Sequence, residues 1–284
     1  MYFVNPSAEL VTQAPGIIGM KKLCELVGRV CTHSEDKIAE DSYIKFLETQ
    51  KRHHHMSPFE AGTVYLIVPF SKDKDITKFF KENIFSFACI HPGEDRVFIT
   101  TNYRVIVEND LEQVMEKYWS EPTDLHIPRI CIKSVTCIEV YKDLTRHRSH
   151  SPMIESTRFC NYFKEKFSQS VGFTLPCWLG YKSGKPEEEK SWVEEKLSVI
   201  EEIYFESQEK WGWDAQRASY FLPQGTKATM YLTAFPHDWE WFMKLRYEQF
   251  TGPVRPDVLE LSTMFKSILE SVGVYESSES SETL

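Results

Sequence analysis

Residues Leu144–Phe159 read LTRHRSHSPMIESTRF and gather cationic and hydroxyl side chains in a chain that is acidic as a whole. Arg146, His147 and Arg148 open the stretch, and Ser156 and Arg158 close it. Arginine binds phosphate through paired N–H donors, and serine adds a neutral hydroxyl donor. The stretch therefore indicates an anion pocket, with a solvated basic turn as an alternative of equal weight at this point.

The residues that follow sharpen the first interpretation. Apolar residues recur with a period near 3.6 from 156 to 167, which predicts a helix that begins at Ser156. Free N–H groups at a helix N-terminus bind anions. We expect Arg158 to close over the same anion, while Arg146 and Arg148 approach it from a strand or loop.

The spacing of these residues resembles a known signature. Arg146-His147-Arg148, seven intervening residues and then Ser156 resemble the motif of the flavin-dependent thymidylate synthases, the ThyX family. Arg158, with the phenylalanine after it, resembles the Arg-Tyr that the family places just behind that serine. Four fixed residues at fixed spacing seldom recur by chance.

Other segments resemble the family in the same order along the chain. HMSPFEA (55–61) is similar to the family's His-x-Thr/Ser-Pro-Phe-Glu-His segment, and GRVC (28–31) to its early Ala-Arg-Val-Ser. ASYFLP (218–223) and FMKLR (242–246) are similar to its late Ala-Arg-x-x-Leu-Pro and x-Leu-x-Leu-Arg motifs. The resemblance thus extends over most of the chain.

The resemblance implies an enzyme with a ThyX-like α+β fold and a homotetramer whose active sites are shared between subunits. Such enzymes methylate dUMP at C5 to dTMP, taking the methylene from methylenetetrahydrofolate and the hydride from FAD that NADPH has reduced. It also implies roles for individual residues. The expected FAD contacts are His55, Ser57, Arg146, His147 and Arg148. The expected nucleotide contacts are Glu155, Ser156, Arg158, Arg217 and Arg246, and Arg246 is the expected catalytic residue because it favours charge at N3 of the uracil.

Several positions depart from the family pattern. The acidic residue two positions before the signature serine is Ile154 here, and Glu155 adjoins the serine instead. Asp143 replaces a glutamine and Ser219 an arginine, and Phe235 and Trp241 replace asparagines that touch the flavin. Two alternatives therefore stay open: a ThyX-like enzyme that transfers a methyl or hydroxymethyl group to another pyrimidine nucleotide, and a non-catalytic nucleotide-binding subunit.

Hydrophobic periodicity predicts an α+β fold with an antiparallel or mixed sheet covered by helices. Strands are expected at 63–70, 83–90, 95–101, 103–109 and 129–141, and helices at 16–31, 75–83, 110–119, 156–167, 186–211, 214–222, 237–250 and 255–272. Asp110 is the expected N-cap of the third helix. We expect one domain (1–274) with an inserted hairpin and helices at about 71–130, and a disordered acidic tail (275–284).

Composition limits the other function classes. A net charge of −9 argues against broad binding of nucleic acid. Seven scattered cysteines and no secretory signal favour reduced thiols in a cytoplasmic protein, and the most apolar strand is too short to span a membrane. Three consecutive histidines, His53-His54-His55, cannot converge on one ion from a strand, so no metal is expected. Trp211, Trp213 and Trp239 are assigned to the core or a subunit interface, whereas Trp241 aligns with a flavin contact.

Overall fold

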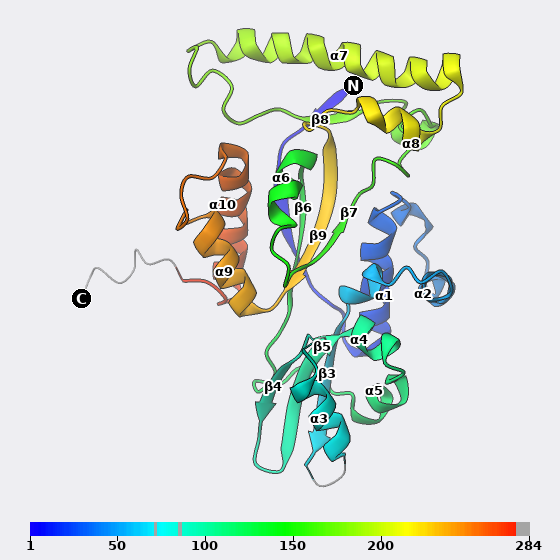
Figure 1. Ribbon diagram of the computed structural model, residues 1–284, viewed down its shortest axis with the longest axis vertical. Coiled ribbons are helices and arrows are strands. Elements are labelled where there is room, and N and C mark those ends of the chain that lie inside the picture. The colour runs from blue at the N-terminus through cyan, green and yellow to red at the C-terminus, as the bar shows by residue number, and fades with distance from the viewer. Residues whose placement is uncertain (71–72, 85–86, 277–284) are drawn as a thin grey trace, which may run out of the picture.

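A four-stranded antiparallel sheet lies at the centre of the protein in the computed structural model, which describes residues 1–70, 73–84 and 87–276 (Figure 1). Its strand order is β2-β6-β9-β7, with β2 at Ser7–Val11, β6 at Ile130–Cys137, β9 at Lys227–Ala234 and β7 at Ser151–Ile154. The helices α6 (Ile138–Leu144), α9 (Pro236–Arg246) and α10 (Pro256–Ser271) cover one face, where Leu232, Trp239 and Phe265 are fully buried. Helix α1 (Gly16–Val30) packs near the other face through Leu23 and Val27.

A second sheet of three antiparallel strands takes two of its strands from the predicted insertion at 71–130. Its order is β3-β5-β4, with bounds Thr63–Pro69, Arg96–Asn102 and Cys89–Pro92. The helices α3 (Lys74–Glu82), α4 (Tyr103–Glu108) and α5 (Glu112–Tyr118) surround it, and α2 (Ser42–Arg52) lies beside α1. Buried Leu66 and Ile99 share a core with Met20 of α1, so this sheet is anchored to the rest of the chain.

The third unit joins the N-terminus to a long helix. Strand β1 (Tyr2–Val4) pairs in parallel with β8 (Gly172–Thr174), and α7 (Pro186–Trp211) runs across that end beside α8 (Ala215–Ala218) (Figure 1). Phe173 and Tyr204 are fully buried between them. Pro186 occupies the first turn of α7, where its missing N–H costs no hydrogen bond.

The structure confirms the α+β class, the hairpin around residues 91–94 and most of the predicted helices. The predicted strand at 103–109 is wrong: the side chain of Asn102 accepts the Val105 N–H and starts helix α4 there. The predicted strand at 129–141 ends at Cys137, and α6 follows it. Part of the predicted strand at 83–90 lies outside the described residues. Sequence reasoning missed β1, β2, β7, β8 and β9.

The predicted helix at 156–167 is also wrong. The carbonyl of Ser156 accepts N–H groups from Phe159 and Cys160, which makes a single turn. The side chain of Asn161 then accepts the Phe163 N–H and competes with helical backbone bonding. Only a 3₁₀ turn at Glu165–Phe167 follows. No helix N-terminus therefore stands behind Ser156.

Two boundary predictions change as well. Asp110 has a left-handed backbone (φ 54°), and Leu111 is the residue that precedes α5. Tyr275 is buried and donates its hydroxyl hydrogen to Glu248 at 2.7 Å, so it belongs to the folded part rather than to the tail. The rest of the predicted tail, from 277, lies outside the described residues. Among described helices, none is long and apolar enough to cross a membrane.

Candidate active site

The Arg-His-Arg residues form the turn between α6 and β7. Arg146 and Arg148 both extend into solvent. Arg146 lies 4.0 Å from the carboxylate of Asp143, and Arg148 donates a long hydrogen bond (3.4 Å) to the carbonyl of Thr145. Their guanidinium groups thus stay largely available to a ligand. His147, between them, points the other way into the core.

His147 meets Arg246 in the interior. The Arg246 Nε–H donates to Nε2 of His147 at 3.0 Å, and an Nη2 hydrogen is donated to the carbonyl of Asp143 at 2.9 Å. Burial, together with the positive charge of Arg246, lowers the pKa of His147 to about 4. The imidazole is therefore neutral at neutral pH, with its proton on Nδ1 and its lone pair toward Arg246.

At the other end of β7, the nucleotide residues gather beside the end of α1. The backbone N–H of Ser156 donates to the carbonyl of Cys31 at 3.0 Å, which fixes the turn. Arg158 is exposed, with its guanidinium 5.7 Å from the centre of the Phe159 ring. Its charge makes no ion pair with a described residue and so remains free to bind an anion.

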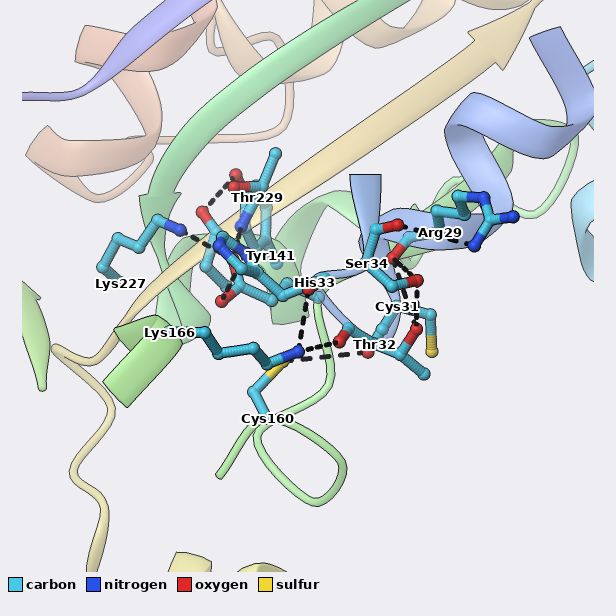
Figure 2. Close-up of polar contacts among 12 residues, drawn as sticks. Arg29, Cys31, Thr32, His33, Ser34, Tyr141, Cys160, Lys166, Lys227 and Thr229 are labelled. Atoms are coloured by element: carbon cyan, nitrogen blue, oxygen red, sulfur yellow. Dashed lines mark hydrogen bonds and ion pairs between the residues drawn. The ribbon is translucent and has the colours of Figure 1, made fainter. Parts of the chain in front are cut away.

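Glu155 is buried and already has partners. Its Oε2 accepts from Lys227 Nζ at 2.7 Å and from the Thr229 backbone N–H at 3.1 Å, and His33 lies 3.9 Å from Oε1. Lys227 and Thr229 come from β9, as Figure 2 shows. Glu155 directly follows the end of β7 at Ile154, and its carboxylate is directed toward Lys227.

Sequence reasoning missed three residues with side-chain nitrogens at this end: His33, Lys166 and Lys227. Lys166 donates to the carbonyls of Thr32 and His33 at 3.4 and 3.0 Å (Figure 2). Lys227 is the first residue of the run KATMYLTA, whose apolar residues are typical of a buried strand. This run was the one sequence feature that could have predicted β9 and so the position of Lys227. His33 lies in a turn without a periodic pattern, and Lys166 lies in the stretch that was wrongly predicted to be a helix, so no sequence signal identified either as a site residue.

The expected FAD-side and phosphate-side residues lie at opposite ends of β7. Arg148 precedes the strand and Ser156 follows it, and the strand alone spans about 10 Å at 3.3 Å per residue. The fold brings Arg246 to the Arg-His-Arg turn but leaves Ser156 and Arg158 at the far end. One chain by itself does not assemble the whole predicted set into one pocket.

His55 and Ser57 lie on a third segment. Both are exposed, before and at the start of a 3₁₀ turn (Ser57–Glu60). Pro58 beneath them is buried against α1, where a Cβ on Gly28 would lie 2.8 Å from the Pro58 side chain. The glycine of GRVC thus permits the close approach that holds this turn in place.

Arg129 links these segments, although sequence reasoning gave it no role. Its Nη1 donates to the carbonyl of Glu60 at 2.8 Å and its Nη2 to the hydroxyl of Ser151 at 3.1 Å. Its guanidinium also lies 5.8 Å from the centre of the Phe235 ring. Arg129 precedes β6 as an isolated cation in a loop, which explains why only the structure shows its importance.

A cavity of about 920 Å³ opens beside Arg129. Glu60, Arg148, His150 and Phe235 line it together with residues of the 71–130 segment. His150 is 5% exposed, and neither ring nitrogen has a hydrogen-bond partner among the described residues. Burial, with smaller effects of His147, Arg129 and His237, lowers its pKa to about 3.

The remaining predicted residues lie elsewhere. Arg217 is exposed on α8 and pairs with Asp214 at 3.0 Å, and Ser219 donates to the carbonyl of Gln216. Trp241 is 51% exposed, whereas Trp239 is core as expected. All seven cysteines are free thiols.

One protein family matches the part of the chain that holds most of these residues. Residues 125–252 match the family model described as thymidylate synthase complementing protein, Thy1. The matched stretch is less than half of the chain, but it contains the Arg-His-Arg turn, Ser156, Arg158, Arg217 and Arg246.

Among solved structures, a UMP/dUMP methylase, PolB from Streptomyces cacaoi, bound with 5-Br dUMP, aligns over 96% of this chain and 94% of that chain. The identity is 15% and the TM-score 0.46, which is too distant a likeness to carry functional detail. No curated protein matches. The part of the chain that is similar to the Thy1 family is therefore residues 125–252.

Proposed function

We propose that this protein is a flavin-dependent, ThyX-like enzyme that methylates dUMP at C5 to dTMP. The observation that carries the proposal is the contact of Arg246 with His147 inside the segment that matches the family. This contact brings a residue of the Arg-His-Arg motif together with the arginine of the late motif at 242–246. A guanidinium there can stabilise anionic charge that develops on a pyrimidine ring without losing a proton.

The residues present suit FAD. Arg146 and Arg148 offer exposed guanidinium groups at one turn, and His55 and Ser57 offer exposed polar groups on another. Paired guanidinium donors match the oxygens of a pyrophosphate. When bound and reduced by NADPH, FAD would supply the hydride that completes the methyl group. His147 is buried behind Arg246, so in this chain it orients that arginine instead of facing solvent.

The nucleotide would bind through the opposite end of β7 and through Arg246. Ser156 and Arg158 would hold the phosphate, and Arg246 would contact the uracil. Glu155 would act on the site indirectly, since Lys227 and Thr229 already occupy its Oε2. Methylenetetrahydrofolate would supply the methylene carbon.

We further propose a homotetramer, because a second copy can supply the end of β7 that one chain places far from Arg246. An exposed apolar stripe on α7 supports association: Trp192, Val199 and Ile203 lie on one side of the helix at spacings of seven and four. We expect a cytoplasmic enzyme that binds neither nucleic acid nor membranes.

The test is direct. Purified protein should show the absorbance of bound FAD and should release tritium from C5-labelled dUMP when given methylenetetrahydrofolate and NADPH. If the flavin-loaded protein is inactive on dUMP but active on UMP or another pyrimidine nucleotide, that nucleotide would be the substrate instead of dUMP. A colourless protein without turnover on any of them would leave the non-catalytic subunit as the correct interpretation.

A further inference from the structure

His33 lies between the buried carboxylate of Glu155 and solvent. Its Nδ1 atom is buried, 3.9 Å from Oε1 of Glu155, and has no hydrogen-bond partner among the described residues. The side chain as a whole is 41% exposed, so the solvent-facing edge of the ring is the one that points away from Glu155. A carboxylate behind an imidazole orients the ring and leaves its other nitrogen, Nε2, on the side open to a ligand.

The backbone at His33 is in the left-handed region (φ 48°), which residues other than glycine seldom adopt. The His33 N–H donates to the carbonyl of Val30 at 3.1 Å, and the His33 carbonyl accepts from Lys166 Nζ at 3.0 Å (Figure 2). The ring packs on Phe167, with 5.0 Å between the ring centres. Residues held in such a conformation cluster at functional sites. The surrounding contacts therefore hold this ring beside Glu155.

The turn that carries His33 also contacts the residues assigned to the nucleotide phosphate. The carbonyl of Cys31, two residues before His33, accepts the Ser156 N–H at 3.0 Å. Burial raises the pKa of the Cys31 thiol, and the charge of Arg158 opposes that rise. The Arg158 guanidinium is therefore near enough to this turn for its charge to act there. His33 borders the same surface as Ser156 and Arg158.

The charged groups around His33 come from three other segments. Lys227 of β9 lies 2.7 Å from Oε2 of Glu155 and neutralises that carboxylate. Lys166 and Arg158 make no ion pair with a described residue. A phosphate bound here would therefore be the one uncompensated anion beside the ring, with about two negative charges. Added negative charge favours the protonated form of a nearby imidazole, and imidazoles titrate near neutral pH.

We propose that His33 is a phosphate-binding residue of the nucleotide site and that it takes up a proton from solvent when the phosphate binds. Glu155 accepts the hydrogen on Nδ1, and the hydrogen on Nε2 is donated to a phosphate oxygen. This inference deepens the proposed function and rests on the nucleotide site at Ser156 and Arg158. His33 lies outside the segment that matches the family, so the match does not assign it this role.

Titration calorimetry of the full-length protein, with FAD present, tests the proton uptake. Binding of dUMP at neutral pH is measured in PIPES and in Tris, whose ionisation enthalpies differ, so the difference in heat gives the number of protons taken up. His33→Asn is the test variant, because asparagine tolerates a left-handed backbone but does not titrate. The phosphate of dUMP contributes its own proton equally in both proteins, so the difference between them isolates His33.

The wild type should take up more protons per dUMP than His33→Asn does. The variant should also bind dUMP about tenfold less tightly, the loss expected for one hydrogen bond to a charged group. This loss should shrink as the pH rises toward about 8, the upper end of the range in which imidazoles usually titrate. Deoxyuridine lacks the phosphate and should bind both proteins equally.

His54→Asn is the matched control. His54 is an exposed histidine with a left-handed backbone (φ 56°) and belongs to the turn after α2. Its replacement should change neither the proton uptake nor the dUMP affinity. Equal proton uptake in the wild type and His33→Asn would overturn the proposal, as would an equal change in His54→Asn. A loss of deoxyuridine affinity equal to that of dUMP would also overturn it, because the substitution would then act on more than the phosphate.

Inorganic phosphate as a second probe separates this inference from the proposed function. If dUMP binds but proton uptake is unchanged in His33→Asn, the role of His33 is refuted and the proposed function stands. If inorganic phosphate binds with proton uptake that depends on His33, while dUMP does not bind, the role of His33 stands and dUMP is refuted as the substrate.

Discussion

Arg246 and His147 are 99 positions apart, yet the Arg246 Nε–H lies 3.0 Å from the Nε2 atom of His147. The carbonyl of Asp143 accepts a second hydrogen from the same guanidinium. Two acceptors on one side of a planar group fix its orientation. The Arg-His-Arg turn and the end of α9 are therefore one structural unit, and the remaining Arg246 donors have a set direction.

Replacement of His147 should reduce turnover more than nucleotide binding. His147→Leu removes the acceptor for the Arg246 Nε–H, and a misdirected guanidinium should lower kcat of tritium release about 10–100-fold. The dissociation constant for dUMP should change less, because Ser156 and Arg158 remain. His147→Gln supplies an acceptor oxygen and should recover part of kcat. Equal kcat in the leucine and glutamine variants would show that the contact has no positioning role.

Acid should destabilise the fold through two buried histidines. His147 and His150 have pKa values of about 4 and 3 in the fold, below the ordinary value of 6.5. Each therefore binds its proton more readily after unfolding, so its contribution to stability is complete above pH 6.5. The contribution is lost as the pH falls from about 6.5 toward 4 for His147 and toward 3 for His150.

His150→Phe isolates one of these effects. The His150 ring packs 4.8 Å from Trp239 and makes no hydrogen bond to a described residue, so an apolar ring should replace it well. Between pH 6 and 4, the free energy of unfolding should fall less steeply than in the wild type, by about 1.4 kcal/mol per pH unit. Urea unfolding at several pH values measures this slope. An unchanged slope would mean that His150 does not stay neutral in the fold.

The Glu155–Lys227 pair should be sensitive to the loss of one partner. Both side chains are largely buried and lie 2.7 Å apart. Lys227→Met leaves a buried carboxylate without its cation and should cost about 3–5 kcal/mol in the free energy of unfolding. The double variant Glu155→Gln, Lys227→Met should recover most of that loss. Additive effects of the two substitutions in urea unfolding would argue against direct coupling.

Ser156 and Arg158 should contribute to nucleotide affinity through the phosphate. Ser156→Ala and Arg158→Ala should each weaken dUMP binding by about 1.5–3 kcal/mol, the range for a hydrogen bond to a charged group. Deoxyuridine lacks the phosphate and should bind both variants as it binds the wild type. Lys164→Ala, an exposed cation of the same region, is the control and should leave dUMP affinity unchanged. A loss of deoxyuridine affinity equal to that of dUMP would contradict the phosphate assignment.

Gly28 should tolerate no side chain. A Cβ at this position would lie 2.8 Å from Pro58 and from the ring of Phe46, and neither can move freely in the packed core. Gly28→Ala should therefore lower the free energy of unfolding by about 1–3 kcal/mol through overpacking. Adding Phe46→Leu should restore part of the loss in thermal unfolding. Wild-type stability in Gly28→Ala would show that the turn at Ser57–Glu60 can shift without cost.

The sequence by itself determined the α+β class, most helices, the hairpin around residues 91–94 and the motif residues. Helices such as α1 and α7 depend on local periodicity and on local features such as Pro186, which a linear pattern records. The short stretches 103–109 and 156–167 were misassigned because their side chains decide the outcome locally: Asn102 caps one helix, and Asn161 interrupts the other.

Only the tertiary structure decided which motif residues meet. Strand β7 separates Arg148 from Ser156, while the packing of α9 on the sheet brings Arg246 to His147. The pairing of Lys227 with Glu155, the position of Arg129 and the cavity behind it depend on contacts between segments far apart in the chain. Sequence spacing fixes the distance along one element, but burial and hydrogen bonding across elements determine which charges face each other.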